Sequence, residues 1–179
     1  MELVTARLKL RSARPDDLEE LHAVLSDPRA TRWWSTPPHV SLDQTSAWLD
    51  SMIANGPGQP DFIVEREGRV IGKAGFWRLP EIGYILHPDS WGQGFAHEAT
   101  SAVVGHVFAT RELDQLTADV DPENLASIRL LERLGFVRTG FAERTLKIGD
   151  EWKDSVYYAL SRRNWLVWNG AATAEASRP

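Results

Sequence analysis

A six-residue segment in the middle of the chain has the residue types of an anion-binding loop. It reads Trp-Gly-Gln-Gly-Phe-Ala and covers residues 91–96. Gly92 and Gly94 carry no side chain, so the backbone there can approach a ligand closely. The pattern that follows is helical, and the free N–H groups at a helix start, together with the helix macrodipole, favour a phosphate. The segment is therefore a candidate phosphate site.

Two known glycine-rich phosphate motifs fit this segment poorly. A dinucleotide-binding fingerprint requires a third small residue where His97 stands, and it follows the first strand of its domain rather than the fourth. The phosphate loop of nucleotidases requires Gly-Lys-Ser/Thr, which does not follow here. An ordinary turn with a helix cap remains the alternative for the six residues taken alone.

The composition limits the class of protein. The chain has 179 residues, the length of one domain, and 42% of them are hydrophobic, enough for a sizeable core. Its 25 acidic and 20 basic residues give a net charge of −5, so we expect no nucleic acid and no membrane as partner. The absence of cysteine excludes disulfides and an acyl-cysteine intermediate. The five histidines lack metal-ligand spacing, and we expect no metal.

Hydrophobic periodicity indicates the elements that hold the loop. Strands are expected at residues 3–11, 61–67, 70–77, 81–86, 116–120, 136–147 and 151–161. Helices are expected at residues 15–27, 41–54, 94–109 and 124–134. Helices alternate with strands of one sheet in this order, which predicts an α/β or α+β class. The loop lies between the fourth strand and the longest helix.

The ends of the chain allow two further expectations. No signal-peptide pattern and no run of 18 apolar residues occurs, which predicts a cytoplasmic protein. We expect one domain over residues 1–164 and a partly disordered tail over residues 165–179, although Trp165 and Leu166 have the character to pack. Exposed strand edges are compatible with a homodimer.

Three groups of residues carry a resemblance to a known family. They are Ile-Gly-Tyr-Ile-Leu at 82–86 before Pro88, the loop at 91–96 followed by Glu-Ala at 98–99, and the run from Asn124 to Phe136 that ends in Gly-Phe. Together they resemble the GNAT acetyltransferases over most of residues 3–164, and most closely the RimJ/RimL branch. Trp91 stands where the family often has Gln or Arg, which is typical of that branch.

The resemblance implies a mixed, mostly antiparallel sheet of about seven strands flanked by about four helices, with acetyl-CoA bound between the fourth and fifth strands. It implies direct acetyl transfer to a primary amine, either a protein N-terminus or a small amine, in a ternary complex. The lack of cysteine agrees with direct transfer. The implied acetyl-CoA contacts are Leu86, Trp91, Gly92, Gln93, Gly94, Phe95, Ala96, His97, Asn124 and Ser127.

Two residues are candidates for the proton transfers of this reaction. Glu81 begins the fourth strand and could accept the amine proton, or it is an exposed strand-end charge. Many family members carry a Tyr on the last helix as the acid, but Leu131 stands at that position. Ser127 lies one turn earlier and could take its role. Asn124 is also a candidate helix cap, and Tyr84 is expected in the core. The missing Tyr keeps a catalytically silent acyl-CoA-binding module as the alternative function.

Tryptophans supply the candidate acceptor wall. The chain has eight of them, and Trp33 and Trp34 lie between the first two helices, where GNAT-like folds wall the acceptor site. With Trp77, Trp152 and the carboxylate of Glu81 they would suit a cationic amine. The alternative is that each tryptophan only covers the core.

Overall fold

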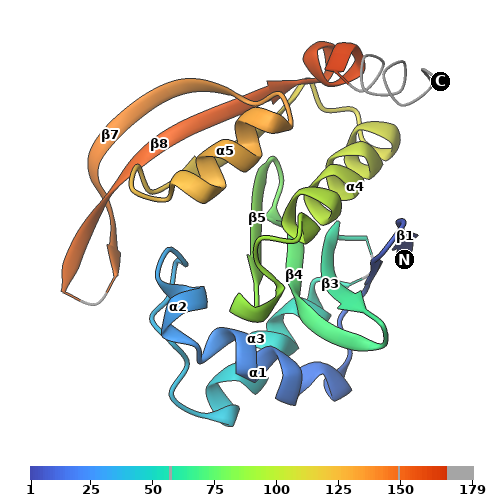
Figure 1. Ribbon diagram of the computed structural model, residues 1–179, viewed down its shortest axis with the longest axis vertical. Coiled ribbons are helices and arrows are strands. Elements are labelled where there is room, and N and C mark those ends of the chain that lie inside the picture. The colour runs from blue at the N-terminus through green and yellow to red at the C-terminus, as the bar shows by residue number, and fades with distance from the viewer. Residues whose placement is uncertain (57, 149, 169–179) are drawn as a thin grey trace.

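The computed structural model describes residues 1–56, 58–148 and 150–168, which form one eight-stranded sheet with helices packed on it (Figure 1). The strands are β1 (Glu2–Val4), β2 (Lys9–Arg11), β3 (Asp61–Arg66), β4 (Arg69–Arg78), β5 (Glu81–Leu86), β6 (Gln115–Val120), β7 (Val137–Ile148) and β8 (Glu151–Ser161). The helices are η1 (Pro15–Asp17), α1 (Leu18–Leu25), α2 (Pro28–Thr31), α3 (Leu42–Ala54), η2 (Pro88–Ser90), α4 (Phe95–Thr110) and α5 (Leu125–Arg133).

The sheet is mixed and mostly antiparallel, as the sequence predicts. Its strand order is β1-β2-β3-β4-β5-β6-β8-β7, and every neighbouring pair is antiparallel except β5 with β6. At one end β7 and β8 continue as a long curved hairpin beyond the other strands (Figure 1). None of the helices in the described part of the chain is both long and apolar enough to cross a membrane.

Strands β5 and β6 part almost as soon as they meet. Within the described residues they pair at one position, Glu81 with Thr117, and the Thr117 amide donates to the Pro80 carbonyl at 2.9 Å. Both strands then continue for several residues without a further paired position. The parted strands open the sheet at its centre, and the turn that follows β5 leads into the glycine loop. In the predicted strand count, β5 and β6 are the fourth and fifth strands, and acetyl-CoA was predicted to bind between them.

The two faces of β5 meet different helices, because side chains alternate along a strand. Ile82 and Leu86 join the large core that contains residues of α4 and α5. Ile85 points the other way and packs with Val24 and Leu25 of α1. The opening between β5 and β6 therefore connects a face covered by α4 and α5 with a face covered by α1–α3.

Two sequence-based boundaries were wrong. The strand predicted over residues 3–11 is two strands, β1 and β2, because Thr5 closes a tight turn by donating from its amide to the Leu8 carbonyl at 2.9 Å. The sheet consequently has eight strands rather than seven. The helix predicted over residues 15–27 consists of η1 and α1. The short helix α2 follows it and was not among the four predicted helices. Asp27 caps α2 and Pro28 occupies its first turn, so Pro28 begins a helix instead of only ending one.

The last described residues pack on the domain. Residues 162–168 are helical, and Trp165 is 5% exposed and lies against Phe108 of α4, with ring centroids 6.4 Å apart. The rest of the predicted tail, residues 169–179, lies outside the described residues.

A buried ion pair lies inside the face covered by α1–α3. Lys73 of β4 donates to Asp61 Oδ2 of β3 at 2.7 Å and lies 2.6 Å from Oδ1, and the two residues are 2% and 7% exposed. Burying either charge alone would cost several kcal/mol, because water no longer solvates it. The pair therefore ties β3 to β4 beneath the helices.

Replacement of Lys73 tests this arrangement. We expect Lys73→Met to lower the free energy of unfolding by about 3–5 kcal/mol, because the Asp61 charge is left buried and unpaired. Adding Asp61→Asn should restore most of the loss. Urea unfolding measures both effects, and Arg69→Ala serves as the control because it removes a surface ion pair with Glu20. A loss below about 1 kcal/mol for Lys73→Met would contradict the prediction.

Candidate functional site

The glycine loop has a backbone that only glycine adopts without strain. Gly92 has φ +71° and Gly94 has φ +81°, and Gly94 is the N-cap of α4. A side chain at Gly92 would meet nothing within 4 Å, so the backbone conformation and not a lack of space requires this glycine. The loop therefore presents bare backbone at the start of the longest helix, which fits a phosphate group.

Side chains of the loop tie it to the end of β5. The Trp91 indole donates to the Leu86 carbonyl at 2.9 Å, and the Gln93 amide donates to the Asp89 carbonyl at 3.0 Å. Trp91 is 49% exposed, whereas Leu86 and Phe95 are buried in the core. Leu86 and Phe95 can thus meet a ligand only through their backbone.

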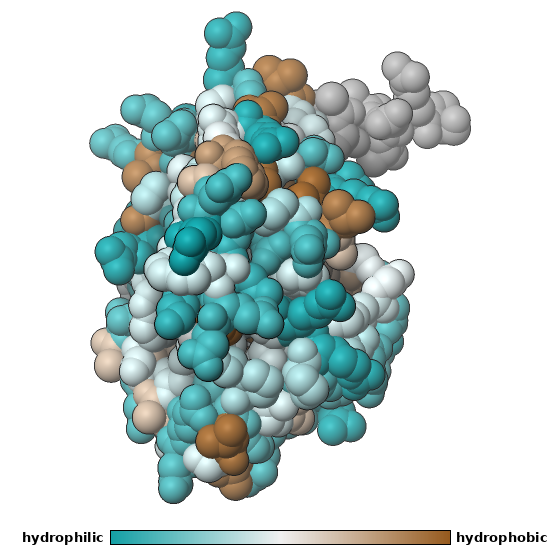
Figure 2. All heavy atoms as spheres, turned by 90° about the vertical axis from the view of Figure 1, so that its left-hand side faces the viewer, coloured by the Kyte–Doolittle hydropathy of each residue, from teal (hydrophilic) through white to brown (hydrophobic). Residues whose placement is uncertain are grey.

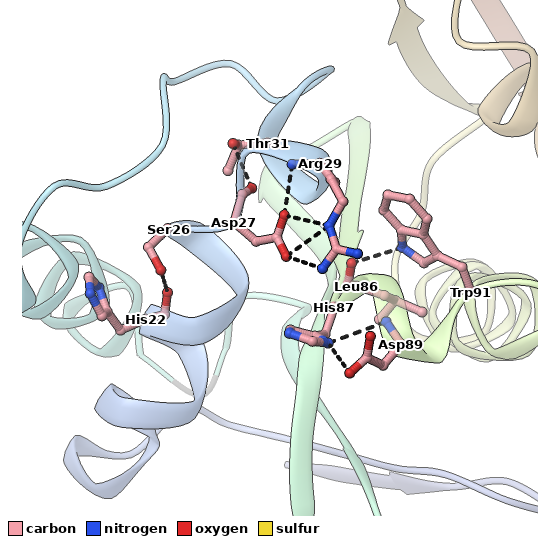
Figure 3. Close-up of polar contacts among 9 residues, drawn as sticks. All are labelled: His22, Ser26, Asp27, Arg29, Thr31, Leu86, His87, Asp89 and Trp91. Carbon is pink, nitrogen blue, oxygen red and sulfur yellow. Dashed lines mark hydrogen bonds and ion pairs between the residues drawn. The ribbon is translucent and has the colours of Figure 1, made fainter.

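Helix α2 lies near the end of β5 and the turn that follows it (Figure 3). Arg29 forms a forked ion pair with Asp27, with its Nη2 2.7 Å from Oδ2 and its Nε 3.1 Å from Oδ1. Hydrogen bonds from the Arg29 side chain lower the pKa of Asp27 to about 2. The Arg29 guanidinium lies beside the turn that carries His87 and Asp89 (Figure 3). The start of α2 and the turn after β5 therefore lie side by side.

His97 points from the first turn of α4 toward the end of the chain. Its ring centroid lies 6.3 Å from that of Trp168. Burial and the nearby Arg133 lower its pKa, which favours the neutral imidazole. Ala96 packs on the core beside it. Neither side chain therefore supplies a positive charge to an anion, and the contribution of Ala96 and His97 to an anion site is their backbone.

The start of α5 brings together two predicted acetyl-CoA contacts, Asn124 and Ser127, and Tyr84, which was assigned to the core. Asn124 caps the helix by accepting from the Ser127 amide at 3.2 Å. Ser127 Oγ lies 2.5 Å from the Tyr84 hydroxyl, which comes from β5. Leu131 is fully buried and offers no polar atom. The expectation that Tyr84 lies in the core is confirmed for its ring, and the structure adds that its hydroxyl reaches α5.

Tyr84 thereby supplies a hydroxyl close to where the last helix lacks one. Burial raises its pKa to about 12, although the Ser127 hydrogen bond opposes this, so the phenol stays protonated at neutral pH. Alternation alone could have placed Tyr84 on the α5 face, but its hydrogen bond joins residues 43 positions apart. No local pattern carries that information.

Glu81 begins β5 on the opposite face, next to a second carboxylate. Burial by neighbouring atoms and the charge of Asp119 raise its pKa, and Arg78 partly offsets them, while the side chain stays open to solvent. Asp119 also has a raised pKa, mainly from burial, with Asp121 adding to it and a Ser155 hydrogen bond opposing it. The pairing of Glu81 with Thr117 places Asp119 two residues further along β6 on the same face. No sequence pattern pointed to Asp119.

Three tryptophans line the face that carries Glu81. Trp34 packs with Ile85, and its ring lies so close to Gly83 that a Cβ added there would be 3.8 Å from it. Lys73 Nζ lies 5.8 Å from the Trp34 ring and 5.9 Å from the Trp48 ring, and Trp48 stacks on Trp77 at 6.2 Å. These contacts connect Trp34 and Trp77, two residues of the predicted acceptor wall, through Trp48, which was not among the predicted residues.

Two other tryptophans have different neighbours. Trp33 packs under the Arg32 guanidinium, 4.6 Å from its ring centroid. Trp152 lies on the β7–β8 hairpin against Arg144 at 5.4 Å, 48% exposed. Neither contact joins them to the wall of Trp34, Trp48 and Trp77.

A buried hydroxyl anchors the segment that carries Trp34. The Thr45 hydroxyl of α3 is hydrogen-bonded to His22 Nδ1 of α1 at 2.8 Å and to His39 Nδ1 at 2.9 Å. His39 is 5% exposed, and burial with the charge of His22 lowers its pKa. Neutral His39 therefore holds the segment before α3 against the helices. No group of three potential metal ligands occurs within the described ranges.

Comparisons with known proteins agree with this geometry. A family model described as acetyltransferase (GNAT) domain matches residues 7–137. The uncharacterized N-acetyltransferase p20 of Bacillus licheniformis is 30% identical over 173 residues, which cover 91% of this chain and 97% of that protein. The spermidine N(1)-acetyltransferase of Escherichia coli K12 is 25% identical over 169 residues, 89% of each protein. The [ribosomal protein uS5]-alanine N-acetyltransferase of the same strain is 31% identical over 106 residues, 55% of each.

Solved structures share the fold. A GNAT-family acetyltransferase from Bacillus anthracis superposes with a TM-score of 0.81 at 26% identity, covering 91% of this chain and 99% of that one. The spermidine N-acetyltransferase from Vibrio cholerae, solved with CoA and spermine, superposes with a TM-score of 0.77 at 22% identity. Its superposition covers 90% of this chain and 99% of that one, and at this identity it shows the fold alone.

The buried His39 makes stability depend on pH. Its pKa is lower in the folded chain than its ordinary 6.5, so the unfolded chain binds more protons and stability falls as the pH drops below about 6.5. We expect His39→Asn, which keeps a polar partner for Thr45 without taking up a proton, to lose less stability than the wild type between pH 7.5 and 5.5. Urea unfolding at several pH values measures the two slopes. Parallel slopes would show that His39 makes no contribution.

Proposed function

This chain belongs to the GNAT acetyltransferase family, and we propose that it transfers acetyl directly from acetyl-CoA to a primary amine while both substrates are bound. The enzyme class is N-acetyltransferase with acetyl-CoA as co-substrate. The observation that carries the proposal is the opening between β5 and β6. A carboxylate, Glu81, lies on one side of β5, and a hydroxyl pair, Tyr84 with Ser127, lies on the other.

The residues present suit the phosphates of acetyl-CoA. Gly92 and Gly94 carry no side chains and have positive φ angles, and we propose that the backbone amides at the start of α4 bind the pyrophosphate. Strand β5, which precedes the loop, reaches Ser127 through the Tyr84 hydroxyl, next to the Asn124 cap. We propose that the thioester end lies near this hydroxyl pair.

Glu81 is the proposed proton acceptor. A primary amine is mostly protonated at neutral pH and must lose a proton before it can attack the thioester carbon. The raised pKa of Glu81 brings this carboxylate closer to neutrality and makes it a better base than an ordinary glutamate. Once Glu81 has taken this proton and passed it to solvent, a C–N bond forms as the C–S bond breaks. The attacking nitrogen loses its second proton to the same carboxylate, and CoA leaves as a thiolate that takes up a proton from solvent.

Tyr84 and Ser127 are the proposed donors to the sulfur that leaves. Since both hydroxyls are protonated, one of them can donate to the thiolate while the other supports it through their 2.5 Å contact. The silent acyl-CoA-binding module was favoured by the missing Tyr on the last helix. That reason loses weight because β5 contributes a tyrosine near the same helix.

The acceptor is proposed to be a primary amine that enters along the wall of Trp34, Trp48 and Trp77. Two relatives are named for acetylating spermidine and the alanine of a ribosomal protein, and both acceptors are amines. The aromatic faces and the Glu81 carboxylate suit a cationic amine before it loses its proton. A small amine and a protein N-terminus both satisfy this chemistry.

The expected homodimer stays a prediction. Apolar side chains on the face of the β7–β8 hairpin are scattered among hydrophilic ones (Figure 2). Sedimentation velocity would measure the oligomeric state.

Removing the Glu81 charge tests the proposed base. We expect Glu81→Gln to lower kcat by about 10²–10⁴-fold with little change in the KM for acetyl-CoA, because the amine proton loses its acceptor. The wild-type kcat should rise with pH through the raised pKa of Glu81, and the variant should lack this rise. CoA-thiol release with spermidine and with an alanine-starting peptide measures both. Glu143→Gln, on the exposed hairpin, is the control. Full activity of Glu81→Gln would exclude this role.

The hydroxyl pair has its own test. We expect Tyr84→Phe and Ser127→Ala each to lower kcat by roughly tenfold, about the value of one hydrogen bond to a charged group. The double variant should lose less than the product of the two, because the hydroxyls act as one unit. Steady-state kinetics at saturating acetyl-CoA gives these values. Multiplicative losses would show that the two groups act independently.

A further inference from the structure

Arg7 holds the start of α4 from the edge of the sheet. It lies in the turn between β1 and β2, and its Nε and Nη2 lie 2.7 and 2.6 Å from Glu98 Oε2. Its backbone amide donates to Glu98 Oε1 at 2.9 Å. Glu98 is in the first turn of α4. One side chain from the first ten residues is thus fixed to the helix that follows the glycine loop.

The same guanidinium fixes a peptide group of the loop itself. Arg7 Nη1 donates to the Gln93 carbonyl at 2.9 Å. In a planar trans peptide the C=O and the next N–H point in opposite directions. Because the Gln93 carbonyl points at Arg7, the Gly94 N–H points away from it, toward the opposite side of the loop. Arg7 therefore sets the direction of an amide in the proposed phosphate site.

Arg7 also neutralises an acid that lies close to that site. A free carboxylate in the first helical turn is attracted to the helix N-terminus and would repel an anionic ligand there. Burial alone would raise the pKa of Glu98, but hydrogen bonds from Thr5, whose hydroxyl donates to Oε1 at 2.6 Å, and from Arg7 lower it. The carboxylate is thus charged, and the arginine balances its charge.

An aromatic ring keeps the arginine in place. The Arg7 guanidinium carbon lies 4.5 Å from the centre of the Phe95 ring, and that of Arg66 lies 4.7 Å from it. Arg66 also donates to the Gln93 side-chain oxygen at 3.2 Å. Phe95 is 2% exposed and is the first residue of α4. Loop, helix start and the β1–β2 turn form one packed unit.

We propose that Arg7 is a positioning residue for acetyl-CoA, which directs the Gly94 amide toward the pyrophosphate and cancels the Glu98 charge beside it. This inference rests on the proposed function, since it assumes that the loop binds the pyrophosphate. Arg7 acts through the loop and through Glu98, and it takes no part in the transfer of acetyl.

Calorimetric titration with CoA, together with steady-state kinetics, tests the proposal. We expect Arg7→Ala to raise the Kd for CoA and the KM for acetyl-CoA by at least about tenfold, the value of a charge-assisted hydrogen bond, with kcat within about twofold. Arg7→Lys keeps the charge without the fork and should give intermediate values. Adding Glu98→Gln to Arg7→Ala should recover part of the affinity, because the unbalanced carboxylate is gone. Lys9→Ala, which removes a cation of β2 paired with Glu2, is the control and should bind CoA like the wild type.

The outcomes separate this inference from the function on which it rests. Wild-type protein that fails to bind CoA would overturn both. Wild-type binding with an unchanged Kd in Arg7→Ala and Arg7→Lys would overturn the positioning role alone. Weaker binding in Arg7→Ala that Glu98→Gln does not relieve would overturn the charge-balancing part. A purely structural role of Arg7 would lower the melting temperature of the ligand-free protein and leave the Kd of the folded fraction unchanged.

Discussion

The parallel pairing of β5 with β6 at a single position is the constraint on which the rest of the structure depends. Parallel neighbours need a long crossover connection, and here it is the glycine loop with α4. Since the strands part after Glu81 and Thr117, the sheet has an opening in its middle. Antiparallel strands on both sides keep that opening in place, with β4 pairing along β5 and β8 along β6.

The opening separates the two halves of the proposed chemistry. The period of two along β5 sends Glu81 toward the tryptophan wall and Tyr84 toward α5. An amine and a thioester can therefore approach the same strand from opposite faces. The glycine loop follows β5 after the short turn that contains η2, so the same strand positions the proposed phosphate site, the proton acceptor and the hydroxyl donor.

Paired charges join elements that are distant in sequence. Lys73 with Asp61 ties β3 to β4, and Arg11 ties β2 to η1 and β3 through hydrogen bonds to Asp17 and Glu65. Hydrogen bonds to these carboxylates raise the pKa of Arg11 further. Such pairs are costly to break because each leaves an uncompensated charge away from water. They hold in place the strands around the proposed site.

The sequence alone determined what depends on neighbouring residues: the glycines of the loop, the Asn124 cap, most strand and helix positions, and the family motifs. Backbone conformation and capping act within a few residues, so a linear pattern can reveal them. Only the tertiary structure decided that Tyr84 meets Ser127, that Asp119 lies beside Glu81, that Trp48 joins Trp34 to Trp77, and that Arg7 holds Glu98 across 91 positions. These contacts follow from strand register and from helix packing on the sheet, which depend on the burial of the whole core rather than on any one segment.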